Sequence, residues 1–204
     1  MVLMALGFIN FNSSQFWLSL YLQNILNLRP LTIALYLIPQ AISGILVNIL
    51  AAYILSRVDN RILLSVGGIA YCVSAALLAA MSPESSYWAF IFPALIISVV
   101  GADLQYNVAN MYVLGSLPKD FQSTAGGVFN TVLQLANGVG LGISTAVWNG
   151  VSGPTGEVDS GQGSESDRAN MIKGYRATFW FLCGIAGFGA RISERLSECD
   201  MSST

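Results

Sequence analysis

The chain has 204 residues, of which 54% are hydrophobic and 10% charged, with a formal net charge of −2 and a mean hydropathy of +0.61. Soluble domains carry about 25% charged residues, so this composition excludes an ordinary soluble domain and indicates a membrane protein. The chain has no histidine, which excludes Ser-His and Cys-His nucleophilic sites and argues against catalytic zinc. The three cysteines also lack the spacing of a metal site. We therefore expect no enzyme activity, no cofactor, no metal and no nucleic-acid partner.

Apolar segments follow one another along the chain and are separated at charges and prolines. A helix must run about 20 residues to cross the hydrocarbon core of a bilayer, and the segments divide at such lengths. Lys and Arg fall between or beside these segments, as the cost of a charge in lipid requires. The sequence predicts an all-α integral membrane protein, a bundle over residues 1–192 with six spans at about 2–25, 31–55, 62–80, 88–117, 124–147 and 175–192.

Prolines, charged residues and a tryptophan mark the boundaries between the predicted spans. Pro30 follows the first span, and the charged turn 56–61 separates the second from the third. Trp88 is placed as an interfacial anchor at the start of the fourth span, and Pro118 ends it.

The longest polar stretch, 150–174, is rich in Gly, Ser and acidic residues and is predicted to be a flexible loop outside the membrane. Residues 193–204 are predicted to be a polar C-terminal tail. The distribution of basic residues over the short loops favours Arg57, Arg61 and Lys119 in the cytoplasm. The 150–174 loop would then be extracellular.

Polar side chains recur on one face of four spans. Lipid cannot satisfy such groups, and offsets of three, four and seven residues place them on the same side of a helix. One interpretation is that they hold neighbouring helices together, at about 0.6 to 2 kcal/mol per contact. Their recurrence in the first, second, fourth and fifth spans favours the other interpretation, a shared water-filled cavity. The predicted cavity-lining residues are Asn12, Gln15, Gln40, Asn48, Asn107, Asn110, Asn130, Gln134 and Asn137.

Asp103 is the only ionisable residue near the middle of a span. It shares a helix face with Asn107 and Asn110. Ionisable residues at membrane depth are costly and mark ion or proton sites, so we predict that Asp103 binds a proton or a cation. The alternative is a structural carboxyl that hydrogen-bonds a neighbouring helix.

Glycines recur within the fifth span, at positions 138, 140 and 142. Neither a preceding strand nor the G-x-G-x-x-G spacing of a nucleotide-binding loop is present. The pattern therefore predicts close helix packing.

Three stretches carry a resemblance to a known family. They are residues 16–23 (FWLSLYLQ) with 31–39, residues 52–61, which end in the charged turn, and residues 102–112 (ADLQYNVANMY) with 122–127 (QSTAGG). In these stretches the chain resembles the C-terminal six helices of the major facilitator superfamily, and within it the fungal drug:proton antiporters with fourteen spans. The resemblance covers about residues 8–189.

The turn 52–61 is similar to the superfamily's loop motif of glycine, aspartate and arginines. Arg57 and Arg61 keep the arginines, whereas Asp59 stands at a glycine position. The resemblance implies a gating role for this loop.

The resemblance implies that the six helices form two three-helix repeats, one half of a major facilitator fold. It also implies half of a proton-coupled efflux transporter for multiple drugs or other small molecules. The partners would be the lipid bilayer, a small amphipathic substrate and protons. Because alternating access needs two halves, a missing N-terminal half or a second copy would complete it.

A second hypothesis belongs to another class. The chain would be a truncated membrane protein that does not transport, or an interaction partner of other transporters. In either case we expect a multi-pass integral membrane protein, with the plasma membrane favoured over the vacuolar membrane.

Overall fold

The computed structural model describes residues 2–54, 57, 60–81, 87–115, 118–152 and 165–201. Within these ranges the chain forms six α-helices, one short 3-10 helix and no strand, so the predicted all-helical class is confirmed. The elements are α1 (Val2–Asn24), α2 (Pro30–Ile54), α3 (Asn60–Ala79), α4 (Tyr87–Gly115), η1 (Lys119–Phe121), α5 (Gln122–Ser152) and α6 (Glu165–Met201).

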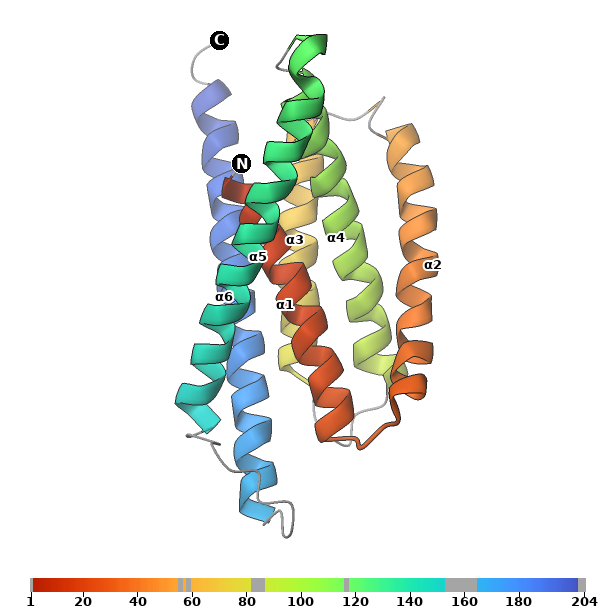
Figure 1. Ribbon diagram of the computed structural model, residues 1–204, viewed down its shortest axis with the longest axis vertical. Helices are drawn as coiled ribbons and strands as arrows, with labels where there is room; N and C mark the ends of the chain where they lie inside the picture. The colour runs from red at the N-terminus through yellow and green to blue at the C-terminus, as the bar shows by residue number, and fades with distance from the viewer. Residues whose placement is uncertain are drawn as a thin grey trace.

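The six helices form one bundle in which each runs opposite to the one before it (Figure 1). α3 packs mainly against α4 and α6, α2 packs against α4, and α5 packs against α1 and α6. The C-terminal end of α2, the turn at η1 and the C-terminal end of α6 lie at one end of the bundle. The C-terminal ends of α1, α3 and α5 lie at the other end.

Among the described residues, three helices are long and apolar enough to cross a membrane by length and composition: α2 over Pro30–Ala51, α3 over Ile62–Ala79 and α4 over Phe90–Val113. α1, α5 and α6 carry more polar residues along their length. The arrangement as six spans in two three-helix repeats stays a prediction.

The last two helices are longer than the apolar segments from which they were predicted. α5 continues to Ser152, and α6 runs from Glu165 to Met201. Residues 150–152 and 165–174 of the predicted loop are therefore helical, as is 193–201 of the predicted polar tail. Hydropathy locates the hydrocarbon boundary, whereas a helix continues for as long as its residues favour helical backbone. Residues 153–164 lie outside the described part.

The turn between α1 and α2 has a local cause in the sequence. Asn27 adopts a φ of 49°, a left-handed conformation that asparagine tolerates better than most residues, and α1 stops before it. Pro30 is the first residue of α2, where its missing N–H costs no helical hydrogen bond. The Arg29 carbonyl accepts the N–H groups of Thr32 at 2.9 Å and Ile33 at 3.1 Å, which starts the helix.

The largest core cluster lies at the end of the bundle where α1 finishes, and we call it the aromatic end. Trp17 stacks on Trp148 with 5.7 Å between ring centroids. Tyr175 meets Trp17 and Tyr21 edge-on at 5.9 and 5.5 Å. The buried members come from α1, α2, α3, α4 and α6, with Ile25 just after α1 and Met81 just after α3: Trp17, Leu18, Tyr21, Leu22, Ile25, Ile33, Leu78, Ala79, Met81, Ile91, Ala94, Leu95, Tyr175, Phe179 and Leu182.

The opposite half of the bundle contains two small clusters. One joins α2, α3 and α4 through Ala51, Leu63, Leu104 and Val108, and the other joins α1 and α5 through Met4, Phe129 and Leu133. α2 is the least covered of the three apolar helices, because only 6% of its apolar segment is buried, against 44% for α3 and 50% for α4. Most of the surface of α2 must therefore be covered by lipid or by protein.

The glycines of α5 differ in their surroundings. Gly140 is buried, and a Cβ there would overlap the Ile9 side chain of α1. Gly138 and Gly142 have open space instead. The predicted close packing applies to Gly140.

Candidate functional site

Asp103 lies on α4 beside α2. Its side chain is half-buried, and its Oδ2 atom is shielded from solvent without a hydrogen-bond partner. Across the interface, a Cβ placed on Gly44 of α2 would lie 3.8 Å from that oxygen and 3.6 Å from a Val99 methyl. The carboxyl therefore faces α2 at Gly44, at a distance where a methyl group would make ordinary van der Waals contact.

Two asparagines lie near Asp103, one on each of the two helices. Asn107 Nδ2 donates to Asn48 Oδ1 across the α2–α4 interface at 3.2 Å and to the Asp103 carbonyl at 2.8 Å. Asn48 Nδ2 donates to the Gly44 carbonyl at 3.1 Å, on the part of α2 that lies opposite the Asp103 carboxyl. We call Asp103, Asn48 and Asn107 the amide–carboxyl cluster.

The chemistry of this cluster suits a group that changes its protonation. Asparagine offers both a carbonyl acceptor and an NH₂ donor, so it can pair with a protonated carboxyl or with a carboxylate. The two amides carry no charge that would hold the carboxylate permanently ionised. The cluster can therefore serve both states of Asp103 with the same residues.

The remaining predicted cavity-lining residues lie in different surroundings. Gln40 and Asn110 are half-buried on α2 and α4, the helices of the cluster. On α1, Asn12 donates to the Phe8 carbonyl of its own helix at 3.0 Å, and Gln15 is half-buried. On α5, Asn130 and Gln134 are exposed, whereas Asn137 is half-buried with its Oδ1 unpartnered.

The structure thus brings the polar faces of α2 and α4 together through the contact between Asn48 and Asn107. Convergence of the polar faces of all four helices on one cavity stays a prediction.

The loop motif is described only in part. Arg57 is exposed, and its guanidinium lies 5.1 Å from the ring centroid of Tyr53 in the last turn of α2. Arg61 is in the first turn of α3, but its side chain lies outside the described part, as does Asp59 altogether. The gating role stays a prediction.

The comparison with known proteins decides the family. Residues 1–141 match the family model of the Major Facilitator Superfamily. The chain belongs to this superfamily. The resemblance seen in the three sequence stretches is thereby confirmed, and the superfamily consists of transporters that are integral membrane proteins.

Relatives within the superfamily come from fungi. The chain is 30% identical over 190 residues to "MFS-type transporter 1" of Pyricularia oryzae, covering 86% of the chain and 31% of the relative. It is 24% identical to "Efflux pump terJ" of Aspergillus terreus, over 83% of the chain and 30% of the relative. It is 25% identical to "Major facilitator superfamily multidrug transporter mdr3" of Aspergillus fumigatus, over 76% of the chain and 27% of the relative. The chain thus spans about a third of the length of the curated relatives it matches.

A second polar set on α1 was missed by the sequence reasoning. Asn10 Nδ2 donates to the Leu182 carbonyl of α6 at 2.6 Å, and Trp17 Nε1 donates to Ser144 Oγ of α5 at 2.9 Å. Asn10, Ser14 and Trp17 are spaced by four and seven residues, so the same periodicity could have found them. They hold α1 to α5 and α6 in this superfamily member.

Proposed function

We propose that the chain supplies one half, six spans in two three-helix repeats, of a proton-coupled efflux transporter for small amphipathic molecules. Membership of the superfamily supports the transporter class. The names "efflux pump" and "multidrug transporter" among the fungal relatives support export and the substrate class. The amide–carboxyl cluster supports proton coupling.

The observation that carries the proposal is the position of Asp103 between two helices, with its carboxyl facing Gly44 of α2 and with Asn107, one turn along α4, bonded to Asn48 of α2. A carboxylate can only accept hydrogen bonds, whereas a protonated carboxyl can also donate one. Gain of a proton therefore allows Asp103 to donate a hydrogen bond to the Asn48 amide oxygen, which the carboxylate cannot do. In this way the proton state of Asp103 biases how α2 packs on α4.

Such a bias is what proton coupling requires. A bound proton shifts a conformational equilibrium only if it interacts differently with the two states. We propose that the states differ in the contact between α2 and α4, with the half-buried Gln40 and Asn110 lining the adjacent cavity. The opposite wall would come from an N-terminal half or from a second copy of the chain, because alternating access needs two halves around one site.

Replacement of Asp103 in reconstituted vesicles tests the proton site. Asp103→Asn removes the titrating group at nearly constant volume, so the pH dependence of the flux of a cationic amphipathic dye should be lost while membrane insertion is retained. Asp120→Asn is the matched control, since Asp120 is exposed in η1, and it should leave the flux unchanged. Full retention of the pH dependence in Asp103→Asn would leave Asp103 as a structural hydrogen-bonding group.

The second candidate is a membrane protein that does not transport but associates with other transporters. The poorly covered α2 favours it, because its exposed Leu35, Ile42 and Ile49 form an apolar surface that another protein could cover. Native mass in detergent together with the vesicle assay separates the two candidates. A homodimer with proton-driven flux supports the transporter, whereas a monomer without flux supports the second candidate.

We further propose that the bundle end with Arg57 and η1 faces the cytoplasm, in the plasma membrane rather than the vacuolar membrane. The opposite end of the bundle, where α5 ends and α6 begins, would then be extracellular. Protease added to sealed cells should cleave within residues 153–164. Cleavage there only after permeabilisation would reverse the orientation.

A further inference from the structure

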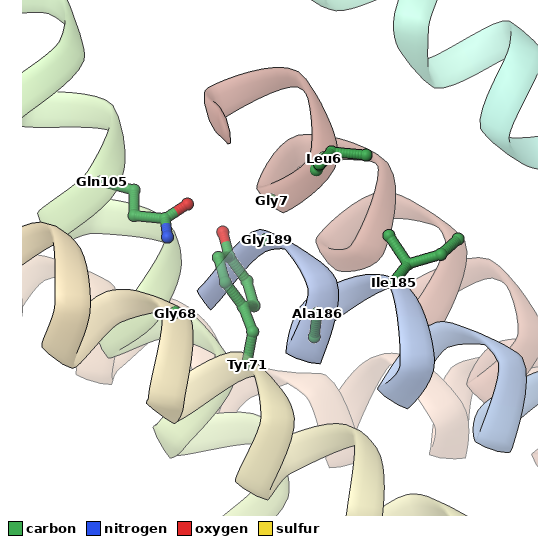
Figure 2. Close-up of a pocket in the computed structure, with 8 residues that line it drawn as sticks. All are labelled: Leu6, Gly7, Gly68, Tyr71, Gln105, Ile185, Ala186 and Gly189. Carbon is green, nitrogen blue, oxygen red and sulfur yellow. The ribbon is translucent and has the colours of Figure 1, made fainter. Parts of the chain in front are cut away.

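A small cavity lies where four helices meet. It has a volume of about 10 Å³ and is lined from α1, α3, α4 and α6 by residues that include Gly7, Gly68, Tyr71, Gln105 and Gly189 (Figure 2). A space of this size holds about one water molecule. The cavity is separate from the amide–carboxyl cluster, since Gln105 is two residues from Asp103 and so projects from another side of α4.

Gln105 gives this cavity its polar character. The residue is only 2% exposed, and its Oε1 atom is shielded from solvent and has no hydrogen-bond partner. Buried carbonyl oxygens are nearly always hydrogen-bonded, because an unmade bond costs free energy. An amide oxygen in this position therefore indicates a small hydrogen-bond donor beside it.

Glycines keep the space open. A Cβ on Gly7 would overlap Gln105 Oε1 and would lie 3.0 Å from Tyr71 Cε2, so no side chain fits on α1 at this point. Glycines on facing helices by themselves indicate only close packing. Here they border a small pocket that contains an acceptor without a partner among the described residues.

Tyr71 supplies a second polar group. It is 3% exposed on α3, and its hydroxyl and the Gln105 amide point into the same space (Figure 2). A hydroxyl can donate and accept, so it can complete the hydrogen bonding of a water molecule held by the amide oxygen.

We propose that this cavity is a hydration site that holds one water molecule between α1, α3 and α4. The water donates one hydrogen bond to Gln105 Oε1 and makes another with the Tyr71 hydroxyl. α3 and α4 are thus joined beside α1 through an exchangeable ligand instead of through a direct side-chain bond.

Radiolytic labelling in H₂¹⁸O tests the site, because hydroxyl radicals formed from a bound water oxidise the side chain beside it. The full chain in lipid nanodiscs is exposed to millisecond X-ray pulses, and the oxidation rates of individual tyrosines are read by mass spectrometry. Tyr21 is the matched control, since it is also 3% exposed but packs against the Tyr175 ring in the aromatic end. Tyr71 should take up ¹⁸O several-fold faster than Tyr21.

Gln105→Leu and Gln105→Met remove the water's acceptor at similar volume, and either one should bring the Tyr71 rate down to that of Tyr21. Two variants are used so that the test remains possible if one of them fails to fold. Equal rates for Tyr71 and Tyr21 in the unaltered chain would mean that the cavity is dry and would overturn the proposal. An unchanged Tyr71 rate in a folded Gln105 variant would overturn it as well, because the water would then not be held by the amide.

Discussion

The aromatic end and the opposite half of the bundle differ in the side chains that hold their helices together. The aromatic end joins buried residues of five helices in one cluster, in which Trp17 and Tyr175 contact each other and the rings of Trp148 and Tyr21. The opposite half divides its apolar contacts between two small clusters and places a carboxyl and two asparagines between α2 and α4. The largest apolar cluster and the amide–carboxyl cluster are thus separated along the bundle.

The largest effect is expected at the aromatic end. Trp17→Ala removes a 3% exposed side chain, its stacking on Trp148 and its hydrogen bond to Ser144. Truncation of a buried aromatic residue costs about 3 to 5 kcal/mol, so the free energy of unfolding in detergent should fall by that amount. Trp180→Ala is the control, because Trp180 on α6 is 60% exposed. Equal losses for the two variants would contradict a stabilising aromatic end.

An intermediate effect is expected where α3 and α4 approach each other. A Cβ on Gly67 would lie 2.7 Å from Gln105 Cγ and 3.2 Å from the Gly101 carbonyl. Gly67→Ala must push the helices apart and should cost about 1 to 3 kcal/mol of unfolding free energy. In Gly138→Ala, where the added methyl meets nothing within 4 Å, we expect a gain of about 0.5 to 1 kcal/mol from helix propensity. The comparison fails if both variants shift the unfolding transition in the same direction.

The smallest effect is expected within the amide–carboxyl cluster. Asn48 and Asn107 share one side-chain hydrogen bond, and such contacts between membrane helices contribute about 0.6 kcal/mol on average. A double-mutant cycle with Asn48→Ala and Asn107→Ala should give a coupling energy near that value.

The cycle of Asn48→Ala with Asn130→Ala is the control, because Asn130 is exposed on α5, a helix that packs against α1 and α6. Its two effects should add to within about 0.5 kcal/mol. A coupling in the first cycle no larger than in the second would mean that the cluster does not join α2 to α4.

The sequence predicted the helices better than their contacts. Lipid requires long apolar segments, so α2, α3 and α4 could be located to within about two residues from Pro30, the charged turn and Pro118. The extra turns of α5 and α6 could not be located in this way, because polar helical sequence outside the hydrocarbon looks the same as a polar loop.

For the site, the sequence could predict which residues share a helix face, but not which faces meet in the bundle. Periodicity placed Gln40 with Asn48 and Asp103 with Asn107, each pair on one side of its helix. It could not show the axial position of α2 relative to α4, so the contact between Asn48 and Asn107 was not predicted. For the same reason the second polar face of α1, with Asn10 and Trp17, was passed over: two faces had the required spacing, and only packing shows which is buried.

The alternation of the six helices brings the end of α6 back to the side of the bundle from which α1 starts (Figure 1). Two copies of the chain can therefore be fused head to tail through a flexible linker that stays on one side. Both copies would then have the same orientation, with no added crossing between them. Such a tandem would fix the stoichiometry at two and would allow an altered Asp103 to be placed in one copy at a time.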